Sequence, residues 1–162
     1  MTNFVDYILG GIGSGTIIAL MALALVLTWR ATRVVNFAQV GQAMFTTFIA
    51  LSIQTLTGSW LVALVGAIIA GALLGVVVQY LVLRPVKRMD TSGAIIATFG
   101  VLIALQAAAG MIWGGDSQNY PQPFGNTAIT LFGREWPLSA YDLVVIGFGA
   151  VMVIGLTLLF TR

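Results

Sequence analysis

The sequence predicts an all-α integral membrane protein with about five transmembrane helices. Three observations support this prediction: the composition, the spacing of the charged residues and the positions of the aromatic residues. Of the 162 residues, 59% are hydrophobic and 7% are charged, whereas about 25% of the residues in soluble domains are charged. Together with a mean hydropathy of +1.03, this composition indicates that the chain folds in a lipid bilayer.

Charged residues are separated by four long charge-free runs. A transmembrane helix needs about 20 mainly apolar residues, so three of the runs hold one span each, and the run over residues 34–83 is long enough for two. A small polar turn at residues 57–59 divides this long run. The expected spans are residues 7–29, 35–56, 60–83, 93–113 and 141–160.

Aromatic and basic residues support these boundaries and predict the orientation. All four Trp and all four Tyr lie at span ends or in the loop after the fourth span, where the headgroup region suits their rings. Six of the seven basic residues fall on one side, and an excess of Lys and Arg marks the cytoplasmic side. The N-terminus is therefore expected outside and the C-terminus in the cytoplasm. The basic residues expected at the cytoplasmic face are Arg30, Arg33, Arg84, Lys87 and Arg88.

Small residues recur four positions apart in several spans. This spacing lets helix backbones approach closely in a membrane. We therefore expect helix packing at Gly11, Gly15, Gly71, Gly75, Gly110 and Gly114. The glycine-rich run at residues 10–15 also suggests a phosphate-binding loop, but no strand precedes it and no Gly-Lys-Ser/Thr follows, so packing is the favoured interpretation.

The second span is the most polar. Asn36, Gln39 and Gln42 recur at intervals of three residues and share a helix face about 120° wide. Two interpretations stand: the amides bond neighbouring helices, at about 0.6–2 kcal/mol per bond, or they line a solute path at a discontinuous helix. Thr98 and Gln106 are isolated polar residues on the fourth span. Interhelical bonding is favoured for both, and they are secondary candidates for the same path.

Residues 115–139 form the expected outer loop between the fourth and fifth spans. The loop contains three Pro and several Gly, which suit turns. Within it, residues 127–132 and 135–138 are expected to form a short hairpin around Gly133. This hairpin is the one non-helical element that the sequence predicts.

Missing residue types exclude several classes of function. The chain has no Cys and no His, which excludes thiolate chemistry, Cys- or His-based metal sites and the usual general base. No ionisable residue lies well inside a span, whereas proton-coupled carriers place Asp, Glu or His there. The formal charge of +2, without a basic stripe, argues against nucleic-acid binding. These absences agree with a passive channel or with a transporter subunit that another polypeptide supplies with energy. They agree least with a membrane enzyme.

Three short motifs resemble the branched-chain amino acid ABC transporter permeases of the LivH type. Residues 35–39, Val-Asn-Phe-Ala-Gln, follow Thr-Trp-Arg at 28–30 and resemble the family's Asn-Phe-Ala-(His/Gln)-Gly motif. Residues 83–87 are similar to its Arg-Pro turn. Residues 96–101, with Leu-Gln at 105–106, are similar to its Ala-Thr-(Ile/Leu)-Gly span. The three motifs occur in the family's order.

One position departs from the family motif. Val40 follows Gln39, the glycine is at Gly41, and Gln42 stands near the position of the family's acid. Any role of that acid in gating or in binding the solute's ammonium group is therefore in question for this chain.

The resemblance implies a function and a set of partners. It covers essentially the whole chain but about the first half of a typical family permease. It implies a permease subunit of an ATP-driven importer for branched-chain amino acids or a related small polar solute, in a bacterial inner membrane. The implied partners are a second homologous permease subunit, two cytoplasmic ATPase subunits that bind the ATP, and an extracytoplasmic solute-binding protein. No cofactor is expected on this chain itself.

In this interpretation Phe37 is a candidate apolar gate beside the three amides. Two alternatives from other classes stay open. One is a non-transporting membrane scaffold held by the small-residue faces, and the other is a small independent channel.

Overall fold

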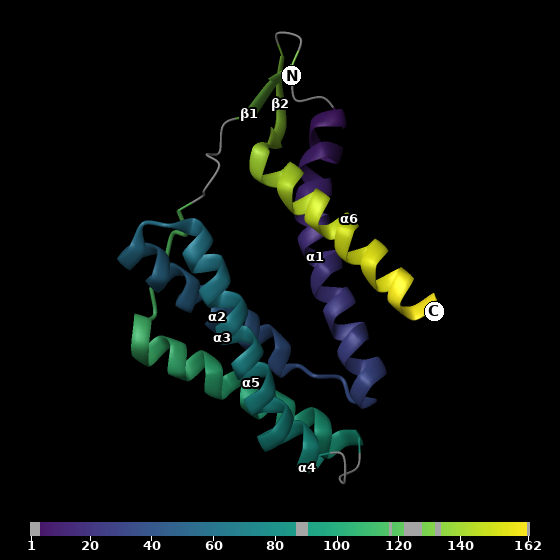
Figure 1. Cartoon of the computed structure of the whole chain (residues 1–162), viewed down its shortest axis with the longest axis vertical. Coiled ribbons are helices and arrows are strands. Elements are labelled where there is room, and N and C mark those ends of the chain that lie inside the picture. The colour runs from purple at the N-terminus through teal and green to yellow at the C-terminus, as the bar shows by residue number, and fades with distance from the viewer. Residues whose placement is uncertain (1–3, 87–90, 117, 122–127, 132–133, 162) are drawn as a thin grey trace. The chain divides into compact units, whose positions relative to one another are not determined.

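Helices account for most of the chain in the computed structural model (Figure 1). The structure describes residues 4–86, 91–116, 118–121, 128–131 and 134–161. In chain order the elements are α1 (Phe4–Thr32), α2 (Ala38–Thr57), α3 (Trp60–Val78), the π-helical turn η1 (Gln79–Leu83), α4 (Arg84–Val86), α5 (Thr91–Trp113), β1 (Ala128–Leu131), β2 (Arg134–Ser139) and α6 (Ala140–Thr161). The predicted all-α membrane fold is confirmed, and each of the five expected spans contains a helix.

Two of these helices end at glycines. Gly58, after α2, has a φ of +67°, and its N–H donates to the Gln54 carbonyl at 2.8 Å. Gly114, after α5, has a φ of +85° and donates to the Gly110 carbonyl at 3.0 Å. Glycine adopts this left-handed conformation without steric cost. The turn expected at residues 57–59 is therefore found at the predicted position.

An irregular turn lies in the third span rather than in the second. α2 is continuous over Ala38–Thr57, so the discontinuous helix of the solute-path interpretation is not found within it. In η1 the N–H of Arg84 donates to the Gln79 carbonyl, five residues back. Pro85 has no N–H for the Leu81 carbonyl, and its ring crowds that carbonyl. α-Helical bonding is therefore interrupted at Gln79–Leu83, just before the proline, and α4 follows at Arg84–Val86.

The chain divides into two compact units, residues 25–120 and residues 1–24 with 121–162. In the first unit α2 packs against both α3 and α5 (Figure 1). The approach of Gly66 to Ile53 and of Gly71 to Thr46 shows that α2 and α3 are antiparallel. Successive spans of a membrane protein run in opposite directions, so this packing agrees with the expected order of spans.

Four helices in the described part of the chain are long and apolar enough to cross a membrane. Their apolar stretches are Gly10–Thr32, Trp60–Leu83, Ser92–Trp113 and Tyr141–Leu158. α2 is not among them, because three glutamines lower its hydropathy. Its contacts with α3 and α5 shelter part of its polar surface from lipid. The stability of α2 in the membrane therefore depends more on its packing against α3 and α5 than on its own hydropathy.

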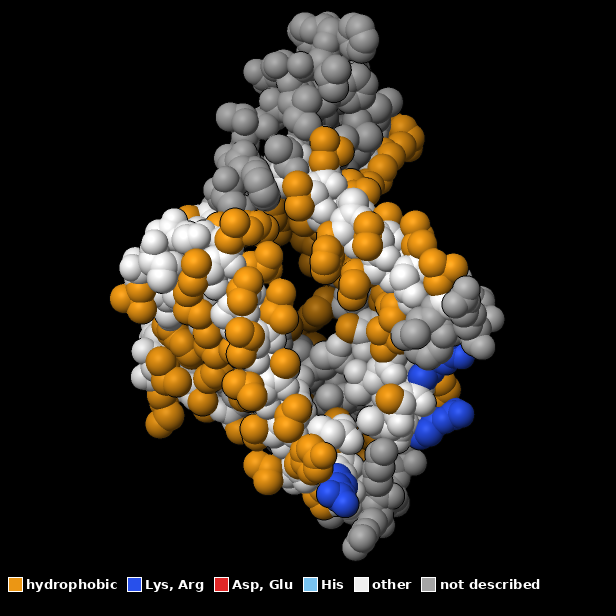
Figure 2. Space-filling view, viewed as in Figure 1, with side chains coloured by type: hydrophobic (Ala, Val, Ile, Leu, Met, Phe, Trp, Pro, Cys, Tyr) orange, Lys and Arg blue, Asp and Glu red, His pale blue; other side chains and the backbone are white. Residues whose placement is uncertain are grey.

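Large apolar side chains cover much of the outer surface (Figure 2). On α3 and η1 the most exposed of them are Leu61, Ile68, Leu73, Tyr80 and Leu81. A monomeric soluble protein rarely exposes an apolar surface of this extent. These exposed apolar side chains would be unfavourable in water, and contact with lipid chains removes that cost.

The predicted hairpin is confirmed in the second unit. β1 and β2 are antiparallel, with Ile129 opposite Trp136 and Leu131 opposite Arg134. The turn at residues 132–133 lies outside the described residues. β2 runs directly into α6, where Ser139 and Asp142 bond reciprocally: Asp142 Oδ2 accepts from the Ser139 N–H and hydroxyl, both at 2.9 Å, and the Asp142 N–H donates to Ser139 Oγ at 3.2 Å. This capping box fixes the start of α6.

Candidate functional site

The candidate site lies where the segment after α1 turns into α2. Asn36 is buried, with 4% of its surface exposed. Its Oδ1 accepts a hydrogen bond from the Ala38 N–H at 3.1 Å, and its carbonyl accepts one from the Gln39 N–H at 3.3 Å. The side chain therefore satisfies a free N–H in the first turn of α2. The Asn36 Oδ1 atom therefore helps to shape the backbone at the start of α2.

Thr98 on α5 holds the same segment from the other side. Its side chain is fully buried. The hydroxyl donates to the Ile95 carbonyl at 2.9 Å and lies 3.5 Å from the Val35 carbonyl. Beside it, the rings of Phe37 and Phe99 stack, with centroids 4.4 Å apart and planes 22° from parallel. The start of α2 is thus attached to α5 by one buried hydroxyl and one aromatic pair.

Of the three candidate glutamines, Gln39 is the one that bonds to another element within the described residues. Its Oε1 accepts a hydrogen bond from the Thr28 hydroxyl of α1 at 3.3 Å. Gln42, one turn further along α2, is half-buried, and Gln106 on α5 is exposed. The structure therefore brings Asn36, Gln39 and Thr98 around one short segment and leaves Gln106 on the outer surface of this chain.

Gly41 is a close-packing position that the sequence patterns did not reveal. A Cβ at this residue would lie 3.0 Å from Leu102 Cδ1, 3.3 Å from Leu102 Cα and 3.3 Å from Leu105 Cδ1. The backbones of α2 and α5 therefore approach each other at Gly41. It was missed because it has no partner glycine four residues away.

An aromatic cluster joins the same two helices further along. The indole Nε1–H of Trp113 donates to Ser52 Oγ at 2.7 Å. The Trp113 ring stacks on Phe48, with centroids 5.3 Å apart, and meets Phe45 edge-on at 5.2 Å. With Phe37 beside Phe99 at the start of α2, these contacts show that α2 and α5 run in the same direction, as expected for the second and fourth spans.

The Trp113 hydrogen bond should stabilise the pairing of α2 and α5. We expect Trp113→Phe and Ser52→Ala each to lower the free energy of unfolding, and the double variant to lose less than their sum. The expected coupling is about 0.6–2 kcal/mol, the range for hydrogen bonds between membrane helices. Thermal denaturation in one detergent measures all four proteins. Additive losses would show that the 2.7 Å contact contributes nothing.

Most of the glycines predicted for helix packing face open space within this chain. A Cβ on Gly71 would touch Thr46 Cγ2 at 3.5 Å, an ordinary contact. The other five, with no described atom within 4 Å of such a Cβ, are Gly11, Gly15, Gly75, Gly110 and Gly114. Close approaches occur instead at Gly13, Gly41, Gly66 and Gly149. Spacing of small residues alone did not identify the surfaces that pack here, because each glycine packs only where a neighbouring helix passes.

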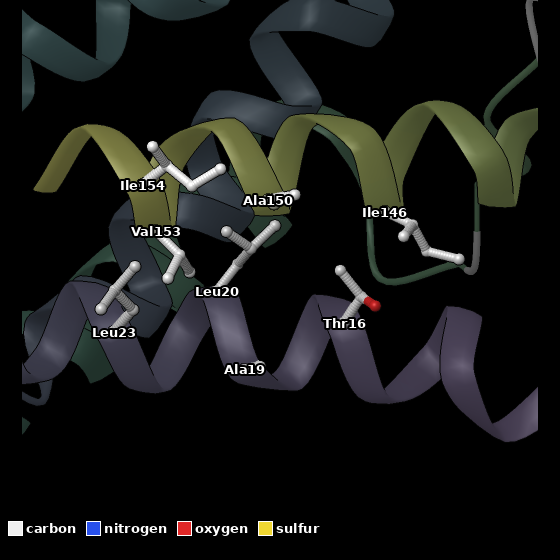
Figure 3. Close-up of a pocket in the computed structure, with 9 residues that line it drawn as sticks. Thr16, Ala19, Leu20, Leu23, Ile146, Ala150, Val153 and Ile154 are labelled. Atoms are coloured by element: carbon white, nitrogen blue, oxygen red, sulfur yellow. The ribbon is translucent and has the colours of Figure 1, made fainter. Parts of the chain in front are cut away.

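In the second unit, α1 and α6 run side by side. Gly149 of α6 approaches Thr16 Cγ2, which would lie 2.9 Å from an added Cβ. A groove of about 470 Å³ follows the two helices (Figure 3). Its walls are formed by Thr16, Ala19, Leu20, Leu23, Ile146, Gly149, Ala150, Val153 and Ile154. The Thr16 hydroxyl donates to the Ile12 carbonyl of its own helix at 2.8 Å, so the groove is lined almost wholly by apolar groups.

Three of the predicted cytoplasmic basic residues are described. Arg30 lies in the last turn of α1, Arg33 directly follows α1, and Arg84 begins α4. All three side chains are exposed. Lys87 and Arg88 lie outside the described residues.

These features define a multi-pass helical membrane protein in which α2, the least apolar of the long helices, packs against apolar neighbours. Residues 7–162 match the family described as branched-chain amino acid transport system / permease component, and the chain belongs to this family. The resemblance inferred from the three motifs is thus confirmed.

A curated relative gives the same assignment. The chain is 32% identical, over an alignment of 160 residues, to the probable branched-chain amino acid transport permease protein LivH of Methanocaldococcus jannaschii. The alignment covers 93% of this chain and 49% of that relative, so the chain spans about half the length of the curated relative it matches. No solved structure matches the chain.

Proposed function

We propose that this chain forms part of the translocation path of an ATP-driven importer for branched-chain amino acids or a related small polar solute. The observation that carries the proposal is the start of α2, where Gln39 and Gln42 follow a segment held by Asn36 and Thr98. Membership of the permease family supports a transport role for these amides. The coupling to ATP and the identity of the solute belong to the proposal.

Each candidate residue takes a distinct role in this proposal. Asn36 and Thr98 position the segment, because Asn36 Oδ1 accepts from the Ala38 N–H and the Thr98 hydroxyl lies 3.5 Å from the Val35 carbonyl. Gln39 and Gln42 supply amide donors and acceptors to the solute. Phe37, stacked on Phe99, closes the path with an apolar surface. Movement of α2 against α5 would alter that stack, so two arrangements with different affinity for the solute become available.

The partners complete the importer. We propose a second homologous permease subunit, two ATPase subunits that bind ATP on the cytoplasmic side, and an extracytoplasmic solute-binding protein, in a bacterial inner membrane. The predicted outside N-terminus places the hairpin on the side of the solute-binding protein. Affinity purification of the tagged permease from its own host would test this set. Purification without any ATPase subunit would contradict it and favour a scaffold or a channel.

A transport assay tests the role of Gln39. In the complete importer, Gln39→Ala is expected to lower leucine uptake about tenfold, because one hydrogen bond to the solute contributes about 1–1.5 kcal/mol. Thr47→Ala is the matched control, since Thr47 is exposed on the same helix and its hydroxyl bonds to the Ala43 carbonyl. Uptake of radiolabelled leucine is measured at equal membrane abundance.

Thr28→Val separates solute binding from interhelical bonding. This variant removes the hydroxyl that donates to Gln39 Oε1 and leaves the amide in place. If Gln39 contacts the solute, Thr28→Val retains most of the uptake. Equal losses in Thr28→Val and Gln39→Ala would show that the amide only joins α1 to α2.

A further inference from the structure

Two arginines in the unit of residues 25–120 each lie over an aromatic ring four residues earlier. The Arg33 guanidinium carbon is 5.3 Å from the centroid of the Trp29 ring, and that of Arg84 is 5.8 Å from the centroid of the Tyr80 ring. Both distances fall within the range of cation–π contacts. Trp29 and Tyr80 are 45% and 60% exposed, so each pair presents a cation and an aromatic residue to its surroundings.

Both pairs lie at the same end of this unit. Ala38, at the start of α2, packs with Val78 and Leu83 at the end of the third span. Arg33 precedes Ala38 by five residues, and Arg84 directly follows Leu83. In Figure 2 the visible basic side chains lie toward its lower half, where Figure 1 shows α4 and the end of α1. This is the end that the basic residues predict to be cytoplasmic.

Arg33 occupies a backbone conformation that favours glycine. Its φ is +59°, and its N–H donates to the Trp29 carbonyl at 2.7 Å, which closes the last turn of α1. At the corresponding ends of α2 and α5 the chain has Gly58 and Gly114. An arginine here carries a steric cost that glycine avoids. A residue held in such a conformation points to a function for its side chain.

We propose that the Arg33–Trp29 and Arg84–Tyr80 pairs bind the phosphate headgroups of anionic phospholipids. A guanidinium donates two parallel hydrogen bonds to a phosphate, and exposed Trp and Tyr rings settle at the depth of the headgroups. Each ring keeps its guanidinium beside the apolar surface of the helix, at the level where lipid phosphates lie. This lipid site is separate from the amides of α2 and does not rest on their role in transport.

A lipid titration tests the site. The complete permease, purified in detergent, is titrated with phosphatidylglycerol and, separately, with phosphatidylcholine, and bound lipid is counted by native mass spectrometry. The variant is Arg33→Gly with Arg84→Gln. Glycine keeps the left-handed end of α1 without strain, so the fold is retained. We expect phosphatidylglycerol affinity to fall about 100-fold, about tenfold for each guanidinium, because a hydrogen bond to a charged group contributes about 1.5 kcal/mol, and phosphatidylcholine binding to stay the same.

Arg30→Gln is the control for removal of one cation, because Arg30 lies at the same helix end. It should weaken phosphatidylglycerol binding about fivefold, the effect of one cation near the membrane surface. If Arg30→Gln weakens phosphatidylglycerol binding as much as each arginine of the double variant does, only bulk charge matters and the proposal is wrong. Wild-type phosphatidylglycerol binding in the double variant would also show that the two pairs are not a lipid site. If the double variant binds lipid normally but no longer co-purifies with ATPase subunits, the arginines contact an acidic protein surface and the lipid proposal is wrong.

Discussion

Gly41→Val is expected to separate α2 from α5 and to abolish most of the transport. The added Cβ would lie 3.3 Å from the Cα of Leu102, and a backbone atom can move away only if the whole helix moves. Overpacking of this kind typically lowers the free energy of unfolding by about 1–3 kcal/mol. At about 2–4 °C per kcal/mol for a chain of this size, thermal denaturation in detergent detects the change, and leucine uptake measures its effect on the path.

Gly100→Val is the matched control for this substitution. Gly100 lies in the middle of α5, it is exposed, and no described atom lies within 4 Å of an added Cβ. Both variants place a β-branched residue in a helix, so the effect of helix propensity is shared. Equal melting temperatures for the two would contradict the close approach of α2 and α5. The control also rules out a general intolerance of larger side chains in these helices.

Gly13→Ala is expected to disrupt the start of α6. A Cβ at Gly13 would lie 2.6 Å from Asp142 Oδ1 and 3.0 Å from its Cγ, so the carboxylate must move. Movement breaks the bonds from the Ser139 N–H and hydroxyl to Oδ2. Loss of such a cap lowers the free energy of unfolding by about 0.5–2 kcal/mol. Gly11→Ala, two residues away with open space around it, should leave the melting temperature unchanged or slightly raised.

A double-mutant cycle shows whether Asp142 is the cause. Asp142→Ala removes the carboxylate and the cap together, so Gly13→Ala should have little further effect in that background. The expected coupling therefore approaches the whole cost of Gly13→Ala alone. Additive losses across the cycle would assign that cost to something other than the Asp142 contact.

Local residue types were enough to predict the course of the helices. Gly58 gives the turn between α2 and α3 because glycine tolerates a positive φ, and the charge-free runs correspond to helices because a membrane span must satisfy its own backbone. The hairpin also follows from the turn-forming residues around Gly133. The capping box at Ser139 and Asp142 was not predicted, although Ser-x-x-Asp before an apolar run is a recognisable local pattern.

The candidate site was predicted in part. Asn36, Gln39 and Thr98 gather around the start of α2. Spacing linked Asn36 with Gln39, but it did not link Thr98 with either residue. Gln106 lies elsewhere on the surface of this chain. Hydrogen-bond partners such as the Ala38 N–H could not be predicted from spacing, because they depend on where the chain bends before the helix begins.

Charge, hydropathy and turn residues therefore establish the membrane class, the helices and the family motifs, since each of these is a property of neighbouring residues. Which glycines pack, and which side chains join α2 to α1 and α5, depend on contacts between residues distant in sequence. Gly41 and Gly75 are both helical glycines, yet an added Cβ would meet Leu102 at Gly41 and open space at Gly75. The physical reason is that a helix surface has no contacts of its own until another helix is placed against it.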